Sequence, residues 1–204
     1  MKFSSSVIAI AAIFFLAACS SGDKGGGKKL VIWSNGSIQQ DAADKTVINF
    51  SPSNRHNELE ISLTANDKQV TIKSSGGDQT YDLPDGGVYL LNLKVDTIIG
   101  SIVTFGTGGQ RTNIGADELD FMIDSTQKLM SGEGASDEKK TFNLPPRAIR
   151  KITSNTSATL LSPYKNIPYE VTPDEKGNAP EYYKFFTNTQ KREALKELID
   201  RLSK

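Results

Sequence analysis

The chain of 204 residues contains one cysteine and one histidine, and its 24 Lys and Arg side chains equal its 24 Asp and Glu side chains in number. A single cysteine excludes an intramolecular disulfide framework. The single histidine, His56, leaves too few ligands for an ordinary zinc site, and no Gly-x-Ser-x-Gly motif accompanies it. We therefore expect His56 to be a loop residue ahead of a strand. Balanced charge provides no field that attracts nucleic acid, so nucleic-acid binding is not expected.

Long hydrophobic runs are also scarce, because only one extends over more than ten residues, from Val7 to Ala18. Its length suits the hydrophobic region of a secretory signal peptide and is too short for a permanent membrane span. The run closes on Leu16-Ala17-Ala18-Cys19, which matches the lipobox at which bacterial lipoproteins are cleaved and acylated. We therefore expect residues 1–18 to be removed as a signal peptide. Cys19 would then anchor the protein in the membrane through acyl chains, palmitate among them.

The residues after the cysteine predict where the anchored domain begins and which membrane holds it. Ser20 resembles the sorting pattern of outer-membrane lipoproteins, in which the residue after the cysteine is not Asp. Residues 19–29 are rich in Gly and Ser, which predicts a flexible tether. We expect residues 30–204 to form one domain, with a sub-boundary near residue 106 as the alternative.

Hydrophobic periodicity predicts an α+β fold whose N-terminal half is an antiparallel small sandwich or curled sheet. Apolar and polar residues alternate over 59–63 and again over 70–72, which predicts a hairpin. Asn35-Gly36 is a strong two-residue turn signal, and residues 74–87 are rich in Gly, Asp and Pro and predict a loop. Further strands are expected at 30–33, 46–50, 88–95, 98–105, 142–146, 149–153 and 158–161.

Two helices are expected in the C-terminal half. Residues 116–130 place apolar side chains on one side at helical spacing, with acidic residues at the start and Gly132 after the end. A second helix is expected over 181–202, with Pro180 in its first turn. Thr187 and Gln190 have the spacing of a capping box within this second segment.

Three stretches are similar to a family of bacterial envelope lipoproteins to which no activity is assigned. They are Tyr89-Leu90-Leu91-Asn92-Leu93, Ile123-Asp124-Ser125 and Pro180–Thr187. The resemblance covers the chain from Val88 to its end. It transfers no catalytic or binding residue.

Several polar groups admit a functional interpretation, and each also has a simpler structural one. The glycine-rich loop 106–112 lacks the Gly-Lys-Ser/Thr ending of a phosphate-binding loop, so a plain connection is expected. Carboxylates in the 74–87 loop could bind calcium, although turn formation explains them equally well: Asp78, Asp82 and Asp85. Carboxylates on the first helix share a face with Lys128, and a solvated face is expected: Asp117, Asp120 and Asp124. A small basic patch could meet an anionic surface: Arg147, Arg150 and Lys151.

Aromatic residues are the stronger candidates for contact with a partner or ligand. Phe121 falls opposite the apolar stripe of its helix, so it is either covered by another segment or exposed for a partner. The aromatic cluster Tyr182, Tyr183, Phe185 and Phe186 is expected to fill the seam between the sheet and the last helix, or to form a platform for a sugar or protein. No coherent catalytic set, metal site or cofactor motif is found. We therefore predict a non-enzymatic binding or assembly component of the bacterial envelope, contacting an envelope protein or glycan. The alternative is an envelope hydrolase acting on glycan through paired carboxylates.

Overall fold

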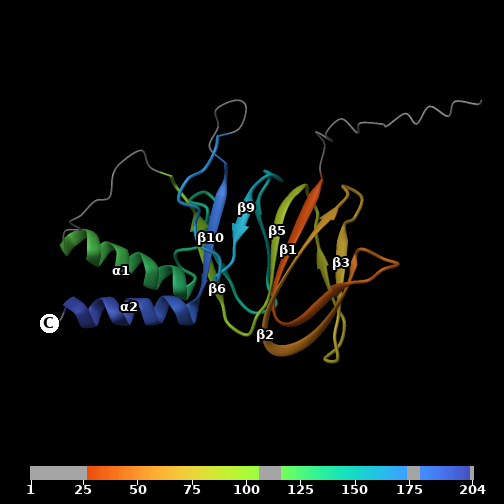
Figure 1. Ribbon diagram of the computed structural model, residues 1–204, viewed down its shortest axis with the longest axis horizontal. Helices are drawn as coiled ribbons and strands as arrows, with labels where there is room; N and C mark the ends of the chain where they lie inside the picture. The colour runs from red at the N-terminus through yellow and green to blue at the C-terminus, as the bar shows by residue number, and fades with distance from the viewer. Residues whose placement is uncertain (1–26, 106–115, 174–179, 203–204) are drawn as a thin grey trace, which may run out of the picture.

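A computed structural model describes residues 27–105, 116–173 and 180–202. This part of the chain forms a six-stranded sheet, a four-stranded sheet and a pair of helices beyond the four-stranded sheet (Figure 1). The β-rich α+β class, with one mid-chain and one C-terminal helix, is confirmed. The elements are β1 Lys28–Gln40, β2 Val47–Leu63, β3 Gln69–Lys73, β4 Gln79–Asp82, β5 Gly87–Leu93, β6 Ile98–Ile102, α1 Ala116–Ser131, β7 Thr141–Leu144, β8 Ile149–Thr153, β9 Thr159–Leu161, β10 Tyr182–Thr187 and α2 Asn188–Leu202. Cys19, the predicted signal peptide, most of the predicted tether and the segment 106–112 lie outside the described residues.

The six-stranded sheet, ordered β4-β3-β2-β1-β5-β8, curls until it is nearly closed. Its longest strand, β2, bends so far that Lys45 before it and Asp67 after it form an ion pair of 3.1 Å. The chain can therefore return along the beginning of β2, and β3 pairs with that part in parallel, with Val47 opposite Thr71. The expected antiparallel hairpin over 59–72 is thus wrong, because the curl and not a tight turn sets the pairing.

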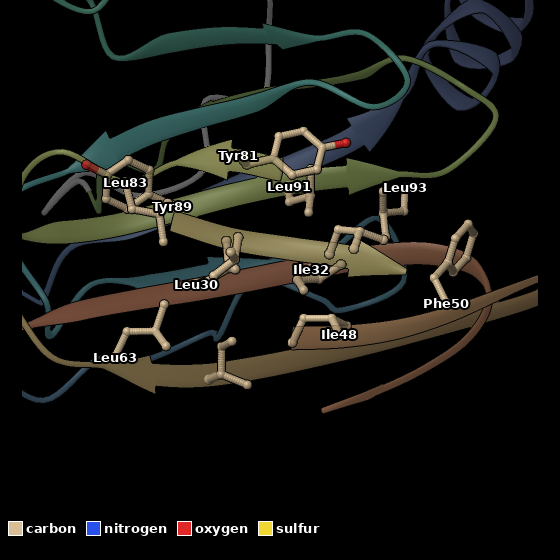
Figure 2. Packing of buried hydrophobic residues seen from close by; sticks show 13 residues of the cluster. Leu30, Ile32, Ile48, Phe50, Leu63, Tyr81, Leu83, Tyr89, Leu91 and Leu93 are labelled. Atoms are coloured by element: carbon tan, nitrogen blue, oxygen red, sulfur yellow. The ribbon is translucent and has the colours of Figure 1, made fainter. Parts of the chain in front are cut away.

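Strand β1 separates two hydrophobic cores, because its successive side chains point to opposite faces. Leu30 and Ile32 point into the space enclosed by the curled sheet, and both are fully buried (Figure 2). Val31 and Trp33 point into the space between the two sheets. A fully buried side chain of this size stabilises the fold by about 1.5–3 kcal/mol, so β1 contributes to both cores.

The second core joins the two sheets, the smaller of which has the order β7-β6-β10-β9. Phe185 of β10 meets Trp33 edge to face, with ring centroids 5.3 Å apart. Phe142 of β7 contacts Tyr183 and Phe185, at 5.8 and 6.2 Å between centroids. These aromatic contacts position β10, and with it the opposite face of the four-stranded sheet on which the helices lie.

Asn35 and Gly36 do not form the predicted turn, because β1 continues through them to Gln40. They lie at a β-bulge: Asn35 is opposite His56, whereas Gly36 is opposite Pro52, so residues 53–55 of β2 have no partner on β1. Asn57 Nδ2 donates to the Gly36 carbonyl oxygen at 2.7 Å. Long-range pairing with β2 therefore overrides a local turn preference.

Three other sequence predictions are corrected in their bounds. The segment 74–87 is not all loop, since β4 pairs there with β3. The strand predicted at 88–95 ends at Leu93, and Val95 is 83% exposed in the turn that follows. The helix predicted from residue 181 begins at Asn188, because residues 182–187 are strand β10.

Two further predictions differ from the structure: the segments 46–50 and 59–63 belong to one strand, β2, and the strand predicted at 98–105 ends at Ile102. Helix α1 and strands β7, β8 and β9 coincide with four predicted segments. The capping box is formed as predicted: the Thr187 amide donates to Gln190 Oε1 at 3.0 Å, and the Gln190 amide donates to Thr187 Oγ1 at 3.1 Å. This box ends β10 and starts α2, so it decides where the first turn of α2 lies relative to the sheet.

Candidate functional site

The candidate site is a pocket of about 510 Å³ between α1 and the outer face of the four-stranded sheet. Its volume lies in the range typical of small-molecule sites. The two helices lie together beyond this sheet (Figure 1), so the pocket is on the side of the sheet away from the inter-sheet core. The lining residues are Ile99, Gly100, Ser101, Phe121, Asp124, Ser125, Thr126, Lys128, Leu129, Gly134, Lys139, Thr141, Lys184, Phe186 and Lys191.

Helix α1 is held against the pocket by its C-terminal end. Gly132, with φ of 94°, ends the helix in a conformation that favours glycine. Asn143 of β7 donates through Nδ2 to the carbonyl oxygens of Leu129 and Met130 at 2.8 and 3.2 Å. Asn188 donates through Nδ2 to the same Met130 oxygen at 3.3 Å. Two asparagines thus satisfy helix-end carbonyls that would otherwise lack a partner, and they tie α1 to β7 and α2.

Phe121 lies on α1 at the pocket and is 70% exposed. The sequence left open whether another segment covers Phe121 or whether it is exposed for a partner, and the structure shows it exposed. The apolar stripe of α1 is itself only partly covered, and Met122 is 47% exposed. The helix consequently offers apolar surface both inside the pocket and beside it.

Strand alternation divides the predicted aromatic cluster between two environments. Tyr183 and Phe185 are fully buried between the sheets and do not reach the helices. Phe186 points the other way and lines the pocket, whereas Tyr182 contacts the ring of Phe105 at 5.5 Å. The expectation that the whole cluster fills the seam beside the last helix is therefore wrong, because a strand with a period of two presents its side chains to both faces.

Two lysines beside Phe186 were not identified from the sequence. Lys184 is only 8% exposed, and its Nζ donates to the carbonyl oxygens of Ser162 and Lys165 at 2.6 and 2.5 Å. Lys184 Nζ lies 4.8 Å from the centroid of the Phe186 ring, and Lys191 Nζ of α2 lies 4.0 Å from it. Lys184 stands between buried aromatics on a strand, which is a signal that sequence reading could have used. No local sequence pattern indicates that Lys191 contacts Phe186, because the position of α2 relative to the sheet creates that contact.

Burial lowers the pKa of both lysines from its ordinary value, since an ammonium is less stable away from water. For Lys184 the neighbouring positive charge of Lys191 lowers the pKa further. Among the described residues, the lining includes four lysines and one acidic residue, Asp124. Asp124 is already engaged by Lys128 at 2.7 Å. The pocket is therefore cationic, with apolar rings at its side.

A second cluster of polar groups surrounds His56, which lies within β2 and not in a loop. His56 Nε2 is 2.8 Å from Glu58 Oε1, and Lys94 Nζ is 2.9 Å from His56 Nδ1. The ring of Tyr164 covers the imidazole, with centroids 4.3 Å apart. Lys165 Nζ donates to Glu58 Oε2 at 2.6 Å. The cluster connects β2, the turn after β5 and the segment after β9.

The two partners of His56 indicate which tautomer of the neutral ring fits them. An ammonium can only donate, so Nδ1 facing Lys94 accepts, and the ring proton lies on Nε2 facing Glu58. Lys94 is only 3% exposed, and burial lowers its pKa, whereas the charges of Glu58 and Asp96 raise it. A carboxylate thus orients the imidazole, but the group on its other nitrogen is a buried ammonium that a substrate cannot reach. We interpret this cluster as structural, because its contacts connect β2, the turn after β5 and the segment after β9.

Replacing Glu58 with glutamine is expected to lower the free energy of unfolding at pH 7 by about 1–3 kcal/mol. Burial raises the pKa of Glu58, but hydrogen bonds from Lys165 and His56 outweigh it and hold the pKa at about 2, below the ordinary 4.5. A lowered carboxyl pKa stabilises the fold above pH 4.5, and this contribution is lost as the pH falls towards 2. Urea unfolding of both proteins at several pH values measures the difference.

Glu60→Gln is the matched control for this prediction, because Glu60 lies on the same strand, is exposed, and pairs with Lys29 at 3.5 Å. We expect it to change stability little at any pH. A difference between wild type and Glu58→Gln that is the same at pH 2.5 as at pH 7 would contradict the role given to the ionised carboxylate.

The three basic residues singled out in the sequence each have a structural partner. Arg150 bonds to Asp137 at 2.8 Å, Lys151 lies 3.8 Å from Asp85, and Arg147 contacts Gln79 at 3.4 Å. Among the described residues, no group of three or more His, Cys, Asp or Glu side chains is placed to hold a metal ion. The calcium alternative for Asp78, Asp82 and Asp85 therefore has no support in this geometry.

Comparisons of the chain with protein-family models, with curated proteins and with solved structures give no match. Within the described part of the chain, neither helix has the length and apolar character needed to cross a membrane. The candidate site must therefore be interpreted from its own geometry.

Proposed function

We propose that this protein is a lipid-anchored binding component of the bacterial cell envelope, acting through the pocket between α1 and the four-stranded sheet. The observation that carries the binding role is the exposed ring of Phe121 at an open pocket that also contains cationic side chains. Exposed aromatic and cationic groups around a hollow favour recognition. The anchor rests on the Leu16–Cys19 lipobox, and Ser20 favours the outer membrane. An envelope protein or glycan is the wider class of partner.

The hydrolase alternative is not supported by the pocket. Hydrolysis of a glycosidic bond needs two carboxyl groups on either side of the bond, about 5–10 Å apart. Of the lining residues that the structure describes, Asp124 alone is acidic, and it is exposed and paired with Lys128. Binding without catalysis therefore fits the lining better.

Replacing Cys19 with serine is expected to abolish acylation and release the protein from membranes, because serine at this position cannot carry the thioether-linked lipid. Cells grown with an alkyne-labelled fatty acid report acylation, and centrifugation of cell fractions reports membrane association. A Cys19→Ser protein that still carries label and sediments with membranes would contradict the proposed anchor. Ser20→Asp is the companion variant, which should keep the label and move to the inner membrane on a density gradient.

The binding role is tested by placing a photo-crosslinking phenylalanine analogue at position 121 in intact cells. A discrete adduct is expected, because the side chain at this position is exposed beside the pocket. The same analogue at Asp78, exposed in the turn between β3 and β4, is the control and should give no such adduct. Equal adducts at both positions, or none at Phe121, would count against the pocket as the binding site.

A further inference from the structure

Among the described residues of the pocket, Lys191 carries a partly buried ammonium whose neighbour is an aromatic ring and not an anion. It lies 4.0 Å from the centroid of the Phe186 ring and is partly buried by its surroundings. Within the described part of the chain, no hydrogen-bond or charged partner offsets the burial that lowers the pKa of Lys191. An ammonium has three hydrogen-bond donors, and removing them from water without acceptors is costly. The ring face compensates only part of this cost.

The positive charge of Lys184 lies close to that of Lys191, and their repulsion favours binding of an anion between them. Lys184 Nζ lies 4.8 Å from the same ring centroid, and the charge of Lys191 disfavours the charged form of Lys184. Lys128 is neutralised by Asp124, so Lys139, Lys184 and Lys191 remain in excess around the hollow. An anion bound between these groups would relieve their repulsion and supply the missing acceptors.

The rest of the lining is suited to the uncharged part of a ligand. Phe121 and Phe186 contribute rings, and Ile99 and Leu129 contribute aliphatic surface. Hydroxyl groups complete the lining at Ser101, Ser125, Thr126 and Thr141. We propose that the pocket binds a small amphipathic anion, a carboxylate or phosphate on an aliphatic or aromatic body, with Lys191 contacting the anion. This inference deepens the binding role proposed above and rests on it.

The test uses four compounds that share a decyl chain and differ in their head group. Decanoate, decyl phosphate, decanol and decyltrimethylammonium are titrated into the purified protein below their aggregation concentrations, and heats of binding are recorded. Both anions are expected to bind at least about 10-fold more tightly than decanol, the magnitude of one charge-assisted hydrogen bond. The cation is expected not to bind. Tighter binding of decyl phosphate would indicate a phosphate-bearing ligand, and tighter binding of decanoate a fatty acid.

Variants assign the effect to the pocket. Lys191→Met keeps the aliphatic stem over Phe186 and should weaken both anions about 10-fold or more while leaving decanol unchanged. Lys196→Met is the matched control, since Lys196 is exposed on the same helix and does not line the pocket. Phe121→Ala should weaken all compounds that bind, and its exposed position makes loss of folding an inadequate explanation. Urea unfolding midpoints verify that each variant is folded.

The outcomes separate this inference from the proposed function. Equal affinity for decanol and decanoate, or unchanged anion affinity in Lys191→Met, would overturn the assignment of an anion. If no decyl compound binds while the adduct at position 121 forms in cells, the ligand class is wrong and the binding role stands. Absence of both would remove the binding role as well.

Discussion

Replacing Phe185 with alanine is expected to lower the free energy of unfolding by about 3–5 kcal/mol. The ring is fully buried between the two sheets, where it meets Trp33 at 5.3 Å and Phe142 at 6.2 Å between centroids. The residue opposite Phe185 on β6 is Gly100, which has no side chain that could fill the space left by the ring. The truncation therefore leaves a cavity that surrounding strands cannot close. Urea unfolding followed by circular dichroism measures the loss.

The next residue along β10 is the control for this prediction. Phe186 is only partly buried and lies on the opposite face, at the pocket. Phe186→Ala should cost about 1 kcal/mol and should weaken binding of the decyl compounds. Equal stability losses for the two variants would mean that the inter-sheet core does not depend on Phe185 as its burial implies.

Replacing Gly36 with alanine is expected to destabilise the protein by roughly 2–5 kcal/mol. A Cβ at this position would lie 2.2 Å from the carbonyl oxygen of Ser51 and 2.8 Å from Cα of Pro52. Both atoms belong to the backbone, so a side-chain rotation cannot relieve the clash. The φ of 146° is also one that residues with a Cβ rarely adopt. Thermal and urea unfolding measure the combined effect.

Gly76→Ala is the matched substitution for Gly36→Ala. Gly76 lies in the turn between β3 and β4, and a Cβ there would meet only Ser74 Oγ at 3.9 Å. We expect its effect to be within about 0.5 kcal/mol. Wild-type stability in Gly36→Ala would show that the bulge can shift register without cost, which would contradict the close backbone approach of β1 and β2.

Local patterns predicted those elements whose local and long-range preferences agree. The apolar stripe of residues 116–130 predicts a helix, and helix α1 is present over Ala116–Ser131. The Thr187 and Gln190 capping box depends on atoms three residues apart, so it could be read from spacing alone. The alternation in β5 likewise identified Tyr89, Leu91 and Leu93 as one face.

The candidate site was only partly predictable, because most of its contacts join residues that are far apart in the sequence. Phe121 was identified because an aromatic residue opposite an apolar stripe is unusual within one helix. Lys184 and Lys191 meet at Phe186 from a strand and a helix, and no spacing rule connects a lysine to a ring through the end of a strand. His56 contacts Lys94, 38 residues away in the sequence, and Tyr164, 108 residues away. The sequence around His56 therefore could not predict these contacts.

The sequence by itself determined the secondary-structure class, the buried faces of the segments 59–63, 70–72 and 89–93, the first helix and the capping box of the last one. Only the tertiary structure decided that Asn35-Gly36 is a bulge, that β3 runs parallel to β2, and that residues 182–187 form a strand. These three features have the same physical reason. Each local preference is worth about 1 kcal/mol or less, whereas pairing along a curled sheet and burying Tyr183 and Phe185 between two sheets contribute several times more.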